Sequence, residues 1–182
     1  MEVIETPLPG ILLIRTAVFS DERGFFTESY NRRVFAEHGL NYDFVQDNHS
    51  LSVRAGVLRG LHYQLNPKAQ SKLIRVLSGS VYDVVVDLRR SSPTFGQWYG
   101  TTLSAENKLQ LLVPRGFAHG FCTLEPNTQV FYKTDEHYSP EHERGIVWND
   151  PELAIPWPVK NPILSEKDRR WPAFAEAEHN FD

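Results

Sequence analysis

Short runs of apolar or alternating residues dominate this chain, and glycine, proline, asparagine, aspartate and serine separate them. Runs of this length and spacing are typical of an all-β sandwich or barrel. We predict strands over Ile11–Ile14, Phe25–Tyr30, Phe44–Gln46, Val57–Gln64, Leu73–Leu77, Val81–Leu88, Leu109–Val113, Phe117–Leu124, Thr128–Lys133 and Gly145–Trp148. The pattern therefore predicts an all-β fold.

Two of these strands carry further signals. Lys72–Leu77 and Val81–Leu88 flank the segment Ser78-Gly79-Ser80, which predicts a β-hairpin with glycine in its turn. The run from Val84 to Val86 is apolar at every position, so it would present apolar side chains to both faces of a sheet. We expect that strand to be central and buried.

The remaining pattern predicts a short helix and an irregular tail. A helix is expected from about Arg32 to His38, with Asn31 as its cap and Gly39 as its terminator. After Asn149 the prolines prevent regular strand pairing, while Trp157 and Trp171 indicate that the tail packs on the barrel. We expect one domain over residues 1–182, with one or two short helices and a Pro-rich C-terminal segment.

Composition narrows the class of protein. A length of 182 residues, with 41% hydrophobic and 23% charged residues, is ordinary for one soluble globular domain. The net charge is −4 and the basic pairs are isolated, so no surface for nucleic acid or anionic membrane is expected. The single cysteine, Cys122, excludes an internal disulfide and is compatible with a reducing cytosol. With no signal-peptide pattern and no membrane-spanning apolar run, the expected location is the cytoplasm.

The most informative chemical feature is His62 within Val57–Gln64. Strand alternation places Gly60, His62 and Gln64 on one face, with Leu61 and Tyr63 on the other. A histidine on a glycine-flanked face has room beside it, which favours proton transfer on a bound small molecule. The alternative is a core histidine that hydrogen-bonds a backbone carbonyl.

A metal site is the next hypothesis. The segment Pro114–His119 resembles the second motif of the cupin superfamily, whose metal-binding members use that histidine. Their first motif supplies two histidines one residue apart and then a glutamate, whereas His62-Tyr63-Gln64 keeps one histidine and has glutamine, a poor transition-metal ligand. We therefore predict a cupin barrel without a metal, and a metal-dependent cupin oxygenase or isomerase remains the alternative.

Phosphate and nucleotide recognition has weaker signals. The chain has no glycine-rich phosphate loop of the Walker or dinucleotide type. Arg23 and Arg59 lie in polar or strand-edge contexts where each could bind phosphate oxygens, although solvated or ion-paired arginines are the alternative. The cluster Gln46–His49 could contact a base or sugar edge, or form a turn.

Lys72 and Tyr132 complete a possible proton-transfer site. By default they would be a surface lysine and an ordinary barrel tyrosine. If both share a cavity with His62, their roles complement one another: the histidine removes a proton, the lysine stabilises an enolate oxygen, and the phenol returns a proton from the opposite side.

Many segments, in order along nearly the whole chain, resemble the dTDP-4-dehydrorhamnose 3,5-epimerase family, which is of the cupin type. The matching segments are Asp21–Glu28, Gln46–Ser50, Gly56–His62, Val86–Arg89, Ser92–Trp98, Pro114–Phe121, Trp148–Pro151 and Leu164–Asp168. The resemblance implies a cupin-like jelly-roll barrel and a homodimer that shares strands across its interface. It also implies inversion of dTDP-4-dehydro-6-deoxy-D-glucose at C3 and C5 to dTDP-4-dehydro-L-rhamnose, with no cofactor.

The resemblance further implies roles for individual residues. His62 would be the base, oriented by Asp168; Tyr132 would be the acid, and Lys72 would support the enolate. Arg59 and Arg23 would hold the diphosphate, and Tyr138 would stack on thymine. The other expected binding residues are Glu28, Gln46, Asp47, Asn48, Glu143, His119, Lys167, Phe19 and Phe26.

Two further alternatives remain open at this point. A related enzyme could invert one centre only or move the ketone. A non-catalytic nucleotide-sugar-binding module would keep the same binding residues without turnover.

Overall fold

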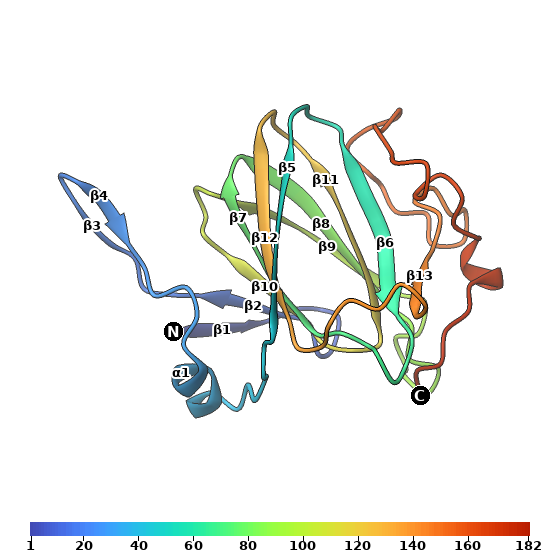
Figure 1. Ribbon diagram of the computed structural model, residues 1–182, viewed down its shortest axis with the longest axis horizontal. Coiled ribbons are helices and arrows are strands. Elements are labelled where there is room, and N and C mark those ends of the chain that lie inside the picture. Colours follow the sequence, from blue (N-terminus) through green and yellow to red (C-terminus); the bar gives the residue numbers. More distant parts are fainter.

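Two antiparallel β-sheets face each other in the computed structural model, which describes residues 1–182 (Figure 1). The six-stranded sheet has the order β1 (Glu2–Glu5), β2 (Leu12–Arg15), β10 (Gln110–Val113), β7 (Lys72–Ser78), β12 (Thr128–Thr134) and β5 (Gln46–Ser52). The five-stranded sheet has the order β13 (Glu143–Gly145), β6 (Leu58–Gln64), β11 (Phe117–Thr123), β8 (Ser80–Asp87) and β9 (Trp98–Ser104). The predicted all-β fold class is confirmed.

The core between the sheets is built from alternate residues of the strands. Ile74 and Val76 of β7 and Val130 of β12 meet Val85 of β8 and Phe121 of β11 there. Because successive strand residues point to opposite faces, the neighbours of Val85 must be covered from the other side. All three valines at 84–86 are fully buried, as their unbroken apolar run predicted.

The C-terminal segment provides that cover on the outer face of the five-stranded sheet. Leu153, Phe174 and Phe181 pack against Val84 and Val86, and the segment contains one turn of 3₁₀ helix, η1 (Phe174–Glu176). It lies along the right-hand side of the barrel in Figure 1. The predicted packing of the proline-rich tail on the barrel is confirmed.

Helix α1 (Arg32–Glu37) packs on the outer face of the six-stranded sheet through Phe35, which meets Ile14 and Leu73. The Asn31 side chain accepts hydrogen bonds from the backbone N–H groups of residues 33 and 34. Gly39 follows with a positive φ of 78°, a conformation that glycine adopts without strain. The predicted helix, its cap and its terminator are confirmed, with the last helical residue at Glu37.

The predicted hairpin between Lys72–Leu77 and Val81–Leu88 is wrong. Strand β7 pairs with β10 and β12, whereas β8 pairs with β9 and β11 in the facing sheet. At Gly79, with a φ of 74°, the chain therefore passes from one sheet to the other. A Cβ added there would lie 2.3 Å from the Thr128 hydroxyl, so glycine is required for this close approach.

Other strands were not predicted from the sequence, or were predicted at shifted positions. No strand was predicted at β1 or β9. Strand β5 was predicted only at its first residue because its inward-facing alternate positions, from Gln46 to Ser52, are polar. Strand β4 (Gly24–Phe26) ends well before Tyr30, and β13 precedes the predicted Gly145–Trp148. Polar edge strands lack the apolar alternation that identifies a half-buried strand.

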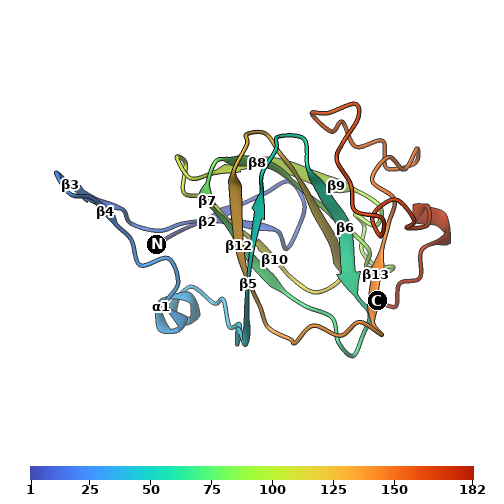
Figure 2. The same cartoon turned by 45° about the horizontal axis from the view of Figure 1, so that its top comes forward.

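The hairpin formed by β3 (Phe19–Asp21) and β4, also missed at its first strand, projects away from the barrel, as Figures 1 and 2 show. Phe19, Phe25 and Phe26 are 65%, 57% and 69% exposed on it. An isolated two-stranded hairpin is marginally stable in water. Three exposed phenylalanines on such a hairpin form the kind of apolar surface that commonly marks an interaction site. No helix of the structure is long and apolar enough to cross a membrane.

Candidate active site

A cavity of about 390 Å³ opens between the two sheets and collects most of the predicted site residues. Its walls are polar and come from both sheets, and the C-terminal segment closes one side. The lining residues are Arg59 and His62 of β6, His119 and Phe121 of β11, Lys72 of β7, Tyr132 of β12, Ser50 of β5, Glu143 of β13, and Tyr138, Ser165, Lys167 and Asp168. His62 and Tyr132 therefore share one cavity from facing sheets.

His62 is held by a carboxylate at the back of the cavity. Its Nε2 lies 2.5 Å from Asp168 Oδ1, and Asp168 is almost fully buried. Against the effect of burial, hydrogen bonds from His62, Ser165 and Trp171 keep the pKa of Asp168 below its usual value, so the carboxylate is ionised. An Nε2–H bond to this carboxylate leaves the lone pair of Nδ1, which makes no hydrogen bond within the chain, for a substrate.

Two glycines and a bulge bring the two histidines together. His119 is opposite His62 in the pairing of β11 with β6, and the register shifts between His119 and Phe121. A Cβ added at Gly60, whose φ is 133°, would lie 2.5 Å from the Cα of Gly120. Bulges commonly redirect side chains near active sites, and here one aims both imidazoles at the cavity.

His119 is paired with a second buried carboxylate. Its Nε2 lies 2.9 Å and 3.0 Å from the two carboxylate oxygens of Asp83, which is fully buried on β8. Asp83 is not among the predicted site residues. An aspartate directly before the apolar run Val84–Val86 of a strand predicted to be buried is the signal that would have found it, because buried carboxylates require partners.

Lys72 and Tyr132 present a cation and a phenol to the same space. Burial lowers the pKa of Lys72 to about 8, although Asp83 and Glu143 act in the opposite direction. Burial also raises the pKa of Tyr132, with Glu143 adding to the effect, so the phenol stays protonated near neutral pH. The Lys72 ammonium lies 6.0 Å from the centre of the Tyr132 ring.

Glu143 links two residues at the mouth of the cavity. Lys167 Nζ donates to one of its oxygens at 2.7 Å, and the Tyr138 hydroxyl donates to the other at 2.9 Å. Despite burial, these bonds lower the pKa of Glu143. Tyr138 remains 52% exposed, so its ring is available at the entrance.

Gln64 occupies the position where metal-binding cupins place a second histidine. It is buried, its Nε2 donates to the carbonyls of Lys68 and His137, and its Oε1 accepts from Ser139 N at 2.8 Å. Its amide is therefore engaged with the backbone on both sides of Tyr138. No three histidine, cysteine, aspartate or glutamate side chains converge where they could hold a metal ion.

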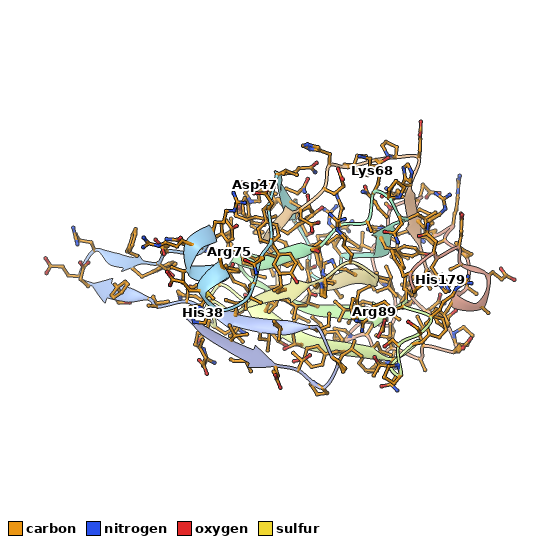
Figure 3. All side chains as sticks on the ribbon, turned by 90° about the horizontal axis from the view of Figure 1, so that it is seen from below. His38, Asp47, Lys68, Arg75, Arg89 and His179 are labelled. Atoms are coloured by element: carbon orange, nitrogen blue, oxygen red, sulfur yellow. The ribbon has the colours of Figure 1, made fainter.

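Seven predicted binding residues are not among those that line the cavity: five lie elsewhere in the chain, and Gln46 and Asn48 lie next to it. Phe19, Arg23 and Phe26 lie on the projecting hairpin, where Arg23 pairs with Asp21. Glu28 lies near the base of the hairpin beside Met1 and Asn31. Asp47 faces outward on β5, pairs with Lys133 and lies at the edge of the molecule in Figure 3.

Gln46 and Asn48 lie next to the cavity on the face of β5 that carries Ser50. Gln46 Nε2 donates to the Asn48 side chain, and Gln46 Oε1 accepts from the backbone N–H of Tyr138. Ser50 and Phe121 line the cavity and were not singled out from the sequence. Both lie within segments that matched the family, but neither carries titratable chemistry that the sequence reasoning would have selected.

Comparisons with known proteins agree on one family. The family model described as dTDP-4-dehydrorhamnose 3,5-epimerase matches residues 5–176. The dTDP-4-dehydrorhamnose 3,5-epimerase of Shigella flexneri is 56% identical over 180 residues, covering 98% of this chain and 99% of the relative.

Solved structures give the same result and confirm the expected cupin-like barrel. The dTDP-4-dehydrorhamnose 3,5-epimerase of Bacillus anthracis, with TDP and PPi bound, has a TM-score of 0.93 at 60% identity, covering 95% of this chain and 99% of that one. The Legionella pneumophila enzyme, in complex with dTDP-4-keto-L-rhamnose, has a TM-score of 0.92 at 46% identity, covering 96% and 93%. With a polar cavity that joins His62, Lys72 and Tyr132 in this same fold, the chain belongs to the dTDP-4-dehydrorhamnose 3,5-epimerase family of carbohydrate isomerases.

Proposed function

We propose that this enzyme inverts C3 and C5 of dTDP-4-dehydro-6-deoxy-D-glucose and so forms dTDP-4-dehydro-L-rhamnose for dTDP-rhamnose biosynthesis. The observation that carries the proposal is the placement of His62 and Tyr132 on facing walls of one cavity. Inversion of a carbon needs a proton to leave one side and another to arrive on the opposite side. A base and an acid on facing walls provide this geometry.

His62 acts as the base in this scheme. Asp168 holds the imidazole through Nε2 and stabilises the positive charge that develops when Nδ1 takes a proton from the sugar. Asp168 itself stays ionised because its hydrogen bonds lower its pKa. The pair thus resembles other histidine–carboxylate pairs in which the carboxylate orients the base.

Lys72 stabilises the enolate. C3 and C5 both flank the C4 ketone, so removal of either proton moves negative charge to the same oxygen, and one cation serves both inversions. Tyr132 then delivers a proton to the opposite face, which it can do because burial keeps its phenol protonated. No step in this scheme uses a cofactor or a metal.

The nucleotide lies at the mouth of the cavity in this proposal. Arg59 contributes to the diphosphate site: its Nε is buried without a hydrogen-bond partner in the chain, which leaves a donor for an anion. Tyr138 stacks on thymine, while Glu143 and Lys167 contact the sugar or nucleotide from the same entrance. His119, Gln46 and Asn48 bind from the inner side.

The active form in this proposal is a homodimer. The hairpin β3–β4 exposes phenylalanines that a second copy would cover, its Arg23, Phe19 and Phe26 are not among the residues that line their own chain's cavity, and Figure 2 shows this hairpin projecting away from the barrel. We place them, with Glu28 and Asp47, at the nucleotide or the interface of the partner. We also propose that residues 1–182 form one domain, because the tail contributes to the same core as β6 and β8, and that the enzyme is cytoplasmic.

Incubation of the enzyme with the dTDP-ketosugar in deuterium oxide tests the proposed reaction. Label at both C3 and C5, with the L-rhamno configuration by NMR, is the expected result. Label and inversion at one carbon only would instead identify a single-centre epimerase. Binding without any label would identify a non-catalytic module.

A further inference from the structure

Trp171 packs against His62, the proposed base, but is not among the residues that line the cavity. Its indole Nε1 lies 3.3 Å from Asp168 Oδ1, the same oxygen that receives His62 Nε2. Its ring meets the His62 imidazole edge to face, with centroids 6.0 Å apart and planes at 67°. The indole therefore touches both members of the pair.

The neighbouring strand leaves space for this indole. Gly145 is opposite His62 in the pairing of β13 with β6. A Cβ added to Gly145 would lie 2.5–2.6 Å from atoms of the Trp171 ring, so no larger residue fits while the indole keeps its place. The backbone N–H of Val147 also donates to the carbonyl of Pro172, which fixes the chain just beyond the tryptophan.

We propose that Trp171 is a positioning residue for proton transfer at His62: its N–H fixes the Asp168 carboxylate, and its ring fixes the plane of the imidazole. This inference rests on the function proposed above. Trp171 is not among the residues that line the cavity, so it acts through His62 and Asp168 and does not bind substrate.

The carboxylate geometry explains why one donor matters. Asp168 Oδ2 accepts from the Ser165 hydroxyl at 2.8 Å, and Oδ1 accepts from His62 and Trp171. Without the indole donor, Oδ1 has only the imidazole to orient it, and the imidazole loses the ring that it packs against. A proton-transfer geometry relaxed in this way lowers turnover while leaving ground-state binding intact.

Trp171→Phe tests the proposal, with Trp157→Phe as the matched control. Trp157 also donates its indole N–H in the C-terminal segment, to the carbonyl of Trp148 at 2.7 Å, but it does not contact His62 or Asp168. For Trp171→Phe we expect kcat to fall about tenfold or more, since a lost hydrogen bond to a charged carboxylate changes a barrier by roughly that factor. KM for the dTDP-ketosugar and the affinity for TDP should stay within about twofold of wild type.

Two more readouts separate positioning from stability. The acidic limb of the kcat/KM profile should move to higher pH in Trp171→Phe, because a carboxylate with one donor fewer holds the proton of its partner more strongly. Gly145→Ala keeps the tryptophan but displaces its ring, including the N–H, from Asp168 and His62. This variant should show the same loss of kcat. Trp157→Phe should change none of these quantities.

Wild-type kcat and an unmoved pH profile in Trp171→Phe would overturn the proposal, as would an equal loss in Trp157→Phe. The NMR signal of the His62 Nε2 proton gives a readout that needs no turnover. It should shift in Trp171→Phe and stay in place in Trp157→Phe. If the wild-type enzyme exchanged no proton of the ketosugar, the proposed function would fail, whereas the NMR result would still decide the role of Trp171.

Discussion

His62 faces the cavity with one nitrogen already committed to Asp168, and Tyr132 faces it from the other sheet. We expect His62→Asn to lower kcat roughly 10²- to 10⁴-fold, the usual contribution of a general base, with TDP affinity kept. Tyr132→Phe should behave differently, because His62 can still remove a proton and return it to the same face. Deuterium should then enter the recovered substrate without inversion. Inverted product from Tyr132→Phe at the wild-type rate would show that another group is the acid.

The lowered pKa of Lys72 predicts that kcat depends on pH. Its ammonium is lost as the pH rises through about 8, the value to which burial lowers its pKa, so kcat should decline over that range. Lys72→Met should retain little activity and lack this limb. A kcat that stays constant from pH 7 to 10 in the wild-type enzyme would contradict the role in enolate stabilisation.

The same lysine should make stability depend on pH. Between about 8 and the usual value of 10.5 the unfolded chain binds the proton and the folded chain does not, so the free energy of unfolding should rise with pH across this window. At pH 7 the folded chain carries the whole free-energy cost of burying the Lys72 charge. Lys72→Met should therefore be more stable than the wild type by about 1–3 kcal/mol. Urea unfolding of both variants at pH 7 and pH 10 measures the effect.

Residue identities alone could predict only part of this site. Strand alternation placed His62 and Gln64 on one face, and the structure agrees. Asp83 and Trp171 reach the two histidines only through sheet packing and a turn distant in sequence. An aspartate in a buried strand signals that Asp83 needs a partner, but no sequence spacing shows that the partner is His119 or that Trp171 contacts His62. The family resemblance supplied Asp168, which residue chemistry by itself would not have paired with His62.

At the scale of elements, the close pair Gly60 and Gly120 holds β6 against β11 beside the bulge. We expect Gly60→Ala to lower the free energy of unfolding by about 2 kcal/mol or more, since it combines a positive φ with a clash against backbone, and to lower kcat by displacing His62. Gly39→Ala is the control: its φ is also positive, but open space surrounds it and it lies far from the cavity. That change should cost about 1 kcal/mol and leave kcat unchanged.

Element prediction succeeded where burial left a clear pattern and failed where topology decided. The apolar runs located β6, β8, β11 and β12 within a residue or two. The connection at Gly79 reads as a hairpin turn because turn residues separate two strands, yet whether those strands pair depends on which sheet each one joins. The edge strand β5 was missed because its inward-facing positions are polar instead of apolar.

At the scale of the whole molecule, the projecting hairpin predicts shared active sites. Heterodimers that combine a His62→Asn chain with an Arg23→Ala chain can be purified with two different tags. If Arg23 serves the partner's cavity, one of the two sites regains both residues, and activity should recover to about half of the wild-type value. Heterodimers as inactive as the two parent variants would show that each chain completes its own site.

Light scattering gives the matching assembly test. Replacement of Phe19 and Phe26 by serine removes exposed apolar surface from the hairpin and should convert a dimer to monomers, with weaker TDP binding. A dimer that persists unchanged would place the interface elsewhere. Residue patterns alone could not predict which surface such a hairpin would contact, because strand alternation carries no information about a partner chain.

Gln64 has a consequence for protein engineering. Its amide is already engaged with the Lys68 and His137 carbonyls and with Ser139 N, so it stabilises the loop that carries Tyr138. A Gln64→His exchange intended to install a metal would give up those contacts and loosen the entrance before any ion arrived. Retrofitting redox chemistry into this barrel therefore requires redesign of that loop together with the ligand.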